Sequence, residues 1–380
     1  MHKYLLTYAI AALLLAGCTA NIDKDATLNP ATANKPKIIA YVTDWKDNWG
    51  AHYEKAKQVT HINYAFANII DGKVVEGNES DEENIKKLNG LKEVNPELKI
   101  LISIGGWTWS DNFSDAVLTE KSRLVFANSA INFLQKHNLD GLDLDWEYPG
   151  QRGEDNVFRP EDKENFTAIL KQLRKKLDSI SSTNKKYLLT IASGANQNYL
   201  DHTNMAEAHK HLDFINIMTY DFHGIGSSKT GHHANLNISA FDSNSNKRNA
   251  TTAVQEHINA GIPAEKIVLG VPFYGKWWKG AIPINNGCYQ ESSGDRGYYS
   301  YSEIADSLFS DNGFISYWDS TANAVYIWRQ KDSLFVTYDN AQSIEKKAAF
   351  VKENHLGGVM FWQYNADNGT LLEAINANLK

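Results

Sequence analysis

Four carboxylic acids follow one another at short intervals in the segment 140–150, whose sequence is Asp-Gly-Leu-Asp-Leu-Asp-Trp-Glu-Tyr-Pro-Gly. If this segment is a strand, alternation places Asp143, Asp145 and Glu147 on one face and the apolar residues between them on the other. Carboxylates about 6–7 Å apart on one face repel one another, so we expect a shared proton and at least one raised pKa. A carboxylic acid that stays protonated near neutral pH can act as a general acid.

Pro149 and Gly150 end this strand just after Glu147, which leaves the Glu147 side chain at the carboxyl end of the strand. The pattern therefore predicts acid catalysis with Glu147 at the outer end of the row. The alternative is an acidic edge that binds a metal or only faces water. Acidic residues within apolar strands rarely serve packing, because burying a charge is costly.

Eight short apolar runs recur along the chain from residue 36, and several helical patterns separate them. The runs lie at 37–42, 61–66, 99–104, 139–145, 187–192, 214–218, 267–271 and 358–362. Helical periodicity is present at 123–136 and 166–177. Alternation of strands and helices is typical of parallel βαβ units, so we predict an α/β fold, namely a (β/α)8 TIM barrel. A doubly wound open sheet of eight strands is the alternative.

The interval 277–337, between the seventh and eighth predicted strands, interrupts this alternation. It contains several glycines and alternating runs at 324–328 and 334–338 instead of a single crossover helix. We predict an α+β insertion subdomain with hairpins. The segment after the seventh strand emerges at the carboxyl ends of the strands, where barrel enzymes build their active sites. We therefore expect the insertion to form one wall of a cleft.

The first 20 residues have the composition of an export signal. Lys3 precedes an apolar run, Ala9 to Leu15, that is too short to span a bilayer. The run ends in Ala16-Gly17-Cys18, which resembles the bacterial lipobox, in which the cysteine becomes the lipidated N-terminus. The alternative is a plain secretory signal in which Cys18 is incidental. The expected divisions are a signal peptide at 1–17, a flexible tether at 18–35 and a catalytic domain at 36–380.

Composition restricts the partners of the chain. It has 38 Lys and Arg against 45 Asp and Glu, and this charge of −7 offers no basic surplus for nucleic acid. Cys18 and Cys288 are its two cysteines, so a lipid on Cys18 leaves no partner for a disulfide within the chain. The adjacent His232 and His233 point to opposite sides of an extended chain. We expect a monomer without metal, cofactor or nucleic acid, and ten Trp residues fit a groove that stacks on sugar rings.

The row of acids, followed by Tyr148-Pro149, resembles the Asp-x-x-Asp-x-Asp-x-Glu signature of family-18 glycoside hydrolases, the chitinases and their relatives. Further matches occur in the same order along the chain, between about Lys37 and Gly369. They are Ser103-Ile-Gly105-Gly106-Trp107, Met218-Thr-Tyr220-Asp221, Tyr274-Gly275, Tyr338-Asp339 and Gly357-Gly-Val-Met-Phe-Trp362.

The resemblance implies hydrolysis with retained configuration, in which the N-acetyl oxygen of the substrate attacks the anomeric carbon. Glu147 would be the general acid, Asp145 would orient the acetamido group, and Asp143 would share the proton of Asp145. The other residues implied at the site are Tyr220 as donor to the acetyl group, Asp221 beside it, Trp362 as the floor under the sugar, and Tyr41 and Ser103 as supports of Asp143. We also expect Trp107, Tyr148, Met218 and Gly106 in substrate binding, and Asp140 in a supporting role.

The resemblance implies a chitinase that acts on chitin or N-acetylglucosamine oligosaccharides. With the lipid at Cys18, we expect it at the bacterial cell envelope, anchored to the outer membrane or the cell surface. The alternatives are an endo-β-N-acetylglucosaminidase that cleaves the chitobiose core of N-glycans and a non-catalytic chitin-binding lectin. Many relatives have Trp-Glu in the eighth strand, where this chain has Trp362-Gln363, which keeps hydrogen-bonding capacity but loses a charge.

Overall fold

Eight parallel strands form a closed barrel in the computed structural model, which describes residues 35–43, 53–244, 247–308 and 313–380. Strand β1 pairs with both β14 and β2, so the barrel prediction is confirmed and the open sheet is excluded. The barrel strands, in order, are β1 (Lys37–Val42), β2 (His61–Ile70), β4 (Lys99–Gly105), β5 (Gly141–Asp145), β6 (Leu188–Gly194), β7 (Phe214–Met218), β8 (Ile267–Pro272) and β14 (Gly358–Trp362).

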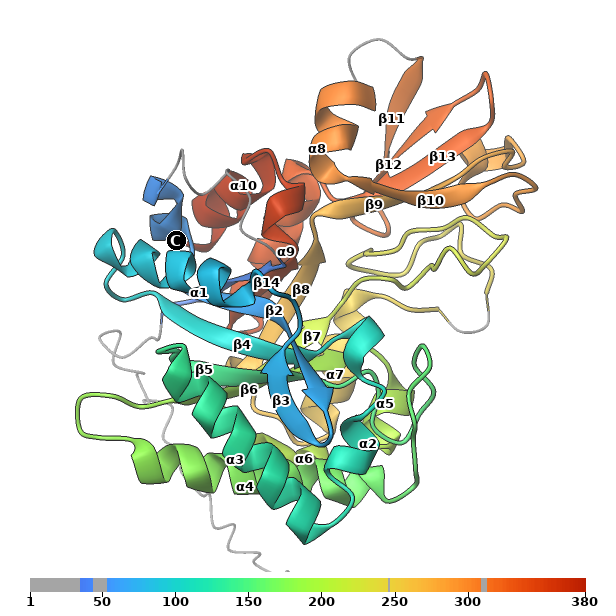
Figure 1. Ribbon diagram of the computed structural model, residues 1–380. Helices are drawn as coiled ribbons and strands as arrows, with labels where there is room; N and C mark the ends of the chain where they lie inside the picture. The colour runs from blue at the N-terminus through green and yellow to red at the C-terminus, as the bar shows by residue number, and fades with distance from the viewer. Residues whose placement is uncertain (1–34, 44–52, 245–246, 309–312) are drawn as a thin grey trace, which may run out of the picture. The chain divides into compact units, whose positions relative to one another are not determined.

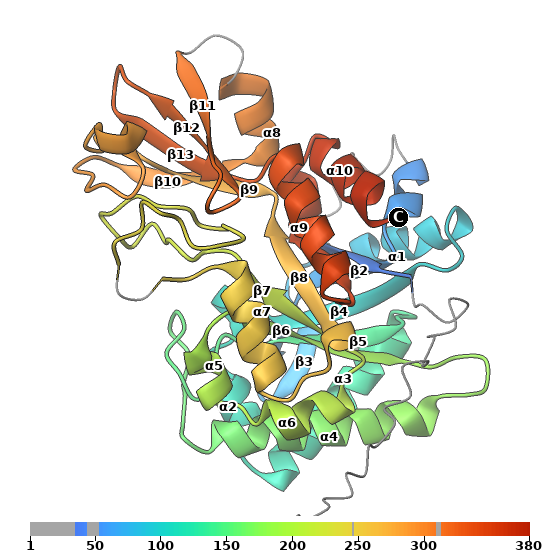
Figure 2. The same cartoon turned by 180° about the vertical axis from the view of Figure 1, so that it is seen from behind.

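Helices cover the outside of the barrel, as Figures 1 and 2 show from opposite sides. The longer helices are α1 (Asp81–Gly90), α3 (Glu120–Lys136), α4 (Asp162–Ile180), α7 (Ala250–Asn259), α9 (Ala341–Glu353) and α10 (Thr370–Leu379). The short ones are α2 (Phe113–Ala116), α5 (Gln197–Asp201), α6 (Met205–Ala208) and α8 (Tyr301–Glu303). Helix α3 begins where Thr119 and Ser122 form a capping box, which satisfies two free N–H groups at its N-terminus.

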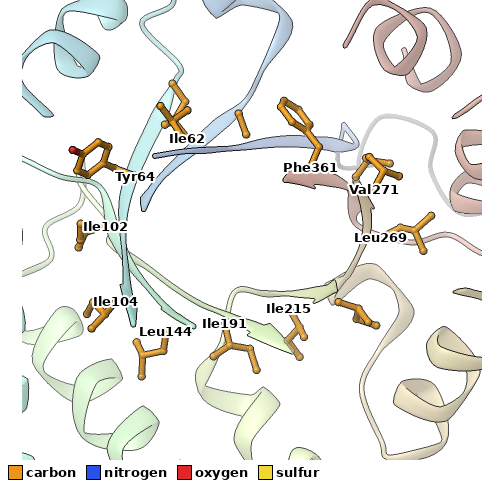
Figure 3. Packing of buried hydrophobic residues seen from close by; sticks show 14 of the residues in the cluster. Ile62, Tyr64, Ile102, Ile104, Leu144, Ile191, Ile215, Leu269, Val271 and Phe361 are labelled. Atoms are coloured by element: carbon orange, nitrogen blue, oxygen red, sulfur yellow. The ribbon is translucent and has the colours of Figure 1, made fainter. Parts of the chain in front are cut away.

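The main hydrophobic core lies between the strands and the helices. Figure 3 shows its aliphatic side chains on the outer side of the ring of strands, among them Ile104, Leu144 and Ile191. Each strand turns its alternate residues into the barrel, and on five neighbouring strands the inward positions include a buried polar residue. These residues are Asn63, Ser103, Asp143, Thr190 and Asn216. The outer layer is therefore apolar, whereas the barrel interior combines these polar residues with a smaller apolar cluster.

A five-stranded antiparallel sheet lies between β8 and β14 in the sequence, in the order β10-β9-β13-β12-β11. Its strands are β9 (Tyr274–Trp278), β10 (Arg296–Ser300), β11 (Phe314–Asp319), β12 (Ala324–Arg329) and β13 (Leu334–Tyr338). A hairpin strand, β3 (Lys73–Glu76), also pairs with β2 at the barrel. The sheet of the insertion begins at Tyr274, before the predicted start at residue 277, because Tyr274 and Gly275 already pair with β10.

The signal peptide, Cys18 and all but the last residue of the predicted tether lie outside the described residues. Residues 36–380 form one compact unit. Within the described ranges, no helix is both long enough and apolar enough to cross a membrane.

Candidate active site

Asp143 lies in the centre of the barrel and is fully buried. Its Oδ2 accepts hydrogen bonds from the hydroxyls of Tyr41 (2.9 Å) and Ser103 (2.8 Å). Its Oδ1 accepts from the Thr190 hydroxyl at 2.6 Å and from the Asn216 amide at 3.4 Å. Burial raises the pKa of Asp143, and these four donors oppose that effect because they stabilise the charged form.

Asp145 is the last residue of β5 and lies one alternation further along the same inward face. Its Oδ1 is buried and has no hydrogen-bond partner within the described structure. Its backbone carbonyl accepts from the Gly106 N–H at 2.7 Å and from the Ser110 hydroxyl at 3.2 Å, which fixes the end of the strand. Burial, the charge of Glu147 and the charge of Asp143 raise the pKa of Asp145 well above its ordinary value.

Glu147 follows the end of β5, and 9% of its surface is exposed. Its backbone N–H donates to the Ser110 hydroxyl at 2.9 Å. Burial raises the pKa of Glu147 to about 7, with a contribution from the charge of Asp221, while a hydrogen bond with Tyr148 opposes the rise. A large part of Glu147 is therefore protonated at neutral pH, as a general acid requires.

Aromatic rings surround this row of acids. Trp362 stacks on Phe66 with 5.5 Å between ring centroids and an angle of 20°, and it lies 5.8 Å from Tyr41. The Tyr220 hydroxyl lies 3.9 Å from Sδ of Met360. Burial, followed by the charge of Asp145, raises the pKa of Tyr220 well above its ordinary value, so its hydroxyl remains a donor.

Asp221 stands beside Tyr220, and half of its side chain is exposed. Its Oδ1 lies 2.6 Å from Nζ of Lys276, accepts from the Tyr274 hydroxyl at 2.5 Å, and lies 3.6 Å from Nδ1 of His233. Burial alone would raise the pKa of Asp221, but the His233 imidazole and the Lys276 charge outweigh burial and hold this pKa below its usual range. Asp221 therefore carries its negative charge throughout the neutral range.

Further aromatic surface lies around Tyr148. The ring of Trp107, 48% exposed, is 6.5 Å from that of Tyr148, and Tyr148 in turn contacts Tyr199 at 6.2 Å. Gly106 has a φ of 75°, and a Cβ there would lie 2.5 Å from the Phe66 ring, so this position needs glycine. Met218 is partly buried against the apolar cluster inside the barrel.

Residues 37–367 match the family described as glycosyl hydrolases family 18. The chain belongs to that family. The predicted membership of family 18 is confirmed, and lipidation of the chain at Cys18 stays a prediction.

Similar proteins include Chitinase A1 of Niallia circulans, 40% identical over 93% of this chain and 60% of that protein. The chain therefore spans less than two thirds of the length of that relative. Chitotriosidase-1 of Mus musculus is 32% identical over 87% of this chain and 73% of its own length. Among solved structures, a family-18 N-acetylglucosaminidase of Paenibacillus barengoltzii superposes with a TM-score of 0.83 and is 38% identical, covering 90% of this chain and 99% of its own.

One residue of the predicted family-18 site lies elsewhere. Asp140 precedes β5 and so lies at the amino ends of the strands, opposite Glu147. Its Oδ2 lies 2.6 Å from Nζ of Lys92 and accepts from the Ile100 N–H at 2.8 Å. These contacts link adjacent segments at that end of the barrel. Asp140 therefore supports the fold and not the row of acids.

Several residues of the family-18 site were missed by sequence reasoning. Thr190 and Asn216 bind Asp143, Ser110 binds the backbone at Asp145 and Glu147, and Phe66 lies against Trp362. Thr190 and Asn216 are each the one polar residue in the apolar stretches 188–192 and 214–218, and this was the available signal for them. Gln363 accepts a hydrogen bond from the Thr43 hydroxyl, so its amide is engaged at the end of β14.

Proposed function

We propose that the protein is a chitinase that hydrolyses β-1,4-linked N-acetylglucosamine chains with retention of anomeric configuration. The observation that carries the proposal is the row of acids Asp143, Asp145 and Glu147. This row ends in Glu147, a buried acid with a pKa of about 7. The names of relatives at 30–40% identity, most of them chitinases, support the same substrate class.

In the first step, protonated Glu147 donates its proton to the glycosidic oxygen as the bond to the leaving sugar breaks. The N-acetyl oxygen of the substrate attacks the anomeric carbon and forms an oxazolinium ion. The free Oδ1 of Asp145 is the acceptor available for the acetamido N–H. When the proton that Asp145 shares with Asp143 lies on Asp143, the negative charge of Asp145 stabilises the cation. The Tyr220 hydroxyl, which remains protonated, donates to the acetyl group.

In the second step, Glu147 is a carboxylate and removes a proton from water, which attacks the anomeric carbon from the face that the leaving group vacated. Two inversions give overall retention. The pKa values of Asp143 and Asp145 are both raised by burial, so this pair can share one proton while Glu147 changes charge.

The test is product analysis with N-acetylglucosamine oligomers of two to six sugars. Proton NMR, recorded before mutarotation, identifies the anomer that is released first. We expect the β-anomer first and, in partly deacetylated oligomers, no cleavage at the anomeric carbon of a sugar that lacks its N-acetyl group. An α-anomeric first product, or efficient cleavage at a deacetylated sugar, contradicts the mechanism.

The structural similarity to a family-18 N-acetylglucosaminidase favours one further candidate, release of single sugars from chain ends. The same oligomer digest decides between the two, because chitinase action on a hexamer yields oligomers, whereas exo action releases monomer from the start. A high-mannose glycoprotein in a parallel digest tests cleavage of the N-glycan core.

We also propose that Cys18 carries a lipid that anchors the protein at the bacterial cell envelope. The support is the Leu-Ala-Gly-Cys junction after a short apolar run. We propose in addition that the insertion forms a wall of the cleft, because Lys276 and Tyr274 of β9 contact Asp221 at the carboxyl end of β7.

A further inference from the structure

Tyr298 lies on β10, an edge strand of the insertion sheet that Figure 1 shows beside β9. Tyr298 pairs with Lys276 across the two strands, so both side chains lie on the same face of the sheet. On that face, Nζ of Lys276 lies 2.6 Å from Oδ1 of Asp221. Tyr298 is nevertheless 53% exposed, whereas Lys276 is buried.

Three tyrosine rings form a continuous series from the mouth of the barrel to this edge strand. The ring of Tyr220 lies 6.2 Å from that of Tyr274, and Tyr274 lies 6.1 Å from Tyr298. Tyr220 is beside the acids, and the Tyr274 hydroxyl is bound to Asp221. Tyr298 is therefore the outermost ring of a series that begins next to the row of acids.

The ring of Tyr298 is held in place by two neighbours, the buried Lys276 and the partly buried Tyr274. Nζ of Lys276 lies 5.5 Å from its centroid, a cation–π contact, and Tyr274 meets it edge-on at 60°. An aromatic ring that is fixed on one side and exposed on the other loses little entropy when it binds a flat apolar surface. The face of a sugar ring is such a surface.

We propose that Tyr298 binds, by stacking, a sugar of the bound chain that lies outside the cleavage point on the side of the insertion. This proposal rests on the proposed function, and it identifies the insertion wall as a determinant of chain length. Tyr298 contacts the substrate without contacting the reacting atoms, so its contribution falls on the binding of longer chains.

The experiment compares Tyr298→Ala, Tyr298→Leu and Tyr298→Phe with Ile315→Ala, an exposed apolar residue on the opposite edge strand β11. Affinity for oligomers of two to six sugars is measured by calorimetry in the Glu147→Gln background, and KM and kcat are measured with Glu147 present. We expect Tyr298→Ala and Tyr298→Leu to weaken binding of long oligomers about three- to tenfold, the range of an aromatic contact, and to leave the shortest unchanged. Tyr298→Phe and Ile315→Ala should match the parent.

A role of Tyr298 in holding Lys276 alone predicts a different result, namely lower kcat at every chain length and a shifted pH profile. The proposal is overturned by that result and also by equal weakening of binding at all oligomer lengths. It is overturned as well if Tyr298→Ala has no larger effect than Ile315→Ala. Loss of affinity in Tyr298→Phe also overturns it, because the ring is retained. Calorimetry needs no turnover, so failure of the stacking proposal and absence of chitinase activity are seen separately.

Discussion

The Tyr41 hydroxyl, on the first strand of the barrel, donates a 2.9 Å hydrogen bond to Oδ2 of Asp143 on the fourth, 102 positions later in the sequence. Both groups are buried, and the pKa of Tyr41 is raised well above its ordinary value by burial and then by the charge of Asp143. The tyrosine therefore remains a donor throughout the neutral range, and it stabilises the charged form of Asp143.

Tyr41→Phe removes one of four donors to Asp143, so the pKa of Asp143 should rise and Asp143 should share its proton less readily. We expect kcat to fall about five- to tenfold, which corresponds to about 1–1.4 kcal/mol of transition-state stabilisation. The matched control is Tyr64→Phe, which removes a buried 2.6 Å hydrogen bond to Asp81 outside the barrel interior. It should lower stability to a similar extent without changing kcat, and equal kcat losses in both variants would contradict a specific role of Tyr41.

Glu147→Gln should lower kcat by at least about 10²–10⁴-fold, because the amide cannot donate a proton. It should keep the affinity for oligomers, since Trp362 and the neighbouring rings are unchanged. Steady-state rates and calorimetry measure the two quantities. A variant that retains a tenth of the parental kcat would exclude Glu147 as the general acid.

The same variant should be more stable than the parent in alkaline solution. The pKa of Glu147 is about 7 when folded, above its value in an unfolded chain, so its favourable contribution is complete below about pH 4.5 and is lost as the pH rises through 7. Glu147→Gln removes that loss, so its melting temperature should equal that of the parent at pH 4.5 and exceed it at pH 8.

A control of opposite sign is Glu76→Gln. Burial disfavours the charged form of Glu76, but hydrogen bonds from Lys136 and His137 outweigh burial and lower its pKa to about 2. The contribution of Glu76 is therefore present above its unfolded pKa and lost only in acid, so this variant should be less stable than the parent at pH 8. Equal melting temperatures of Glu147→Gln and the parent at pH 8 would contradict the raised pKa.

Asp221→Asn should move the alkaline limb of the activity profile to lower pH. The charge of Asp221 contributes to the raised pKa of Glu147, so its removal lets Glu147 lose its proton at lower pH. We expect a shift of up to about one pH unit in kcat, consistent with partly screened charges. An unchanged or more alkaline limb would show that the two carboxylates do not interact. Melting curves report the separate effect of leaving Lys276 without its carboxylate.

Cys18→Ala should release the protein from the membrane fraction or block processing at that point. A lipid contributes about 0.8 kcal/mol per buried CH₂, and several acyl chains hold a protein firmly. Fractionation and labelling with a radioactive fatty acid measure the outcome. Labelled, fully membrane-bound Cys18→Ala protein would rule out the anchor.

Alternation along one strand was sufficient to place Asp143 and Asp145 in the barrel interior and to bring Glu147 to its mouth. The intervening Trp146 points outward, where it stacks on Phe113 at 5.1 Å. The same reasoning could not place Asp140, because the strand begins only at Gly141 and the preceding residue lies at the opposite end.

The partners of the acids were harder to predict than the acids themselves. Thr190 and Asn216, which sequence reasoning missed, come from two different strands, and each is the one polar residue in its apolar stretch, 188–192 and 214–218. Their convergence depends on barrel closure and register, which no local pattern encodes. The environment of Asp221 is hidden for a similar reason, since Lys276 and Tyr274 reach it from the first strand of the insertion.

Because four donors converge on Asp143, burial of this carboxylate depends on assembly of the barrel. Its four partners belong to β1, β4, β6 and β7, so the charge can leave water only after distant parts of the chain have met. In a folding intermediate that lacks one of these strands, burial of the Asp143 carboxylate would leave it without one of its hydrogen-bond donors, so Asp143 stays hydrated. Barrel closure and formation of the row of acids should therefore occur in a single cooperative step. A protein trapped before this step has neither a closed barrel nor an assembled row of acids.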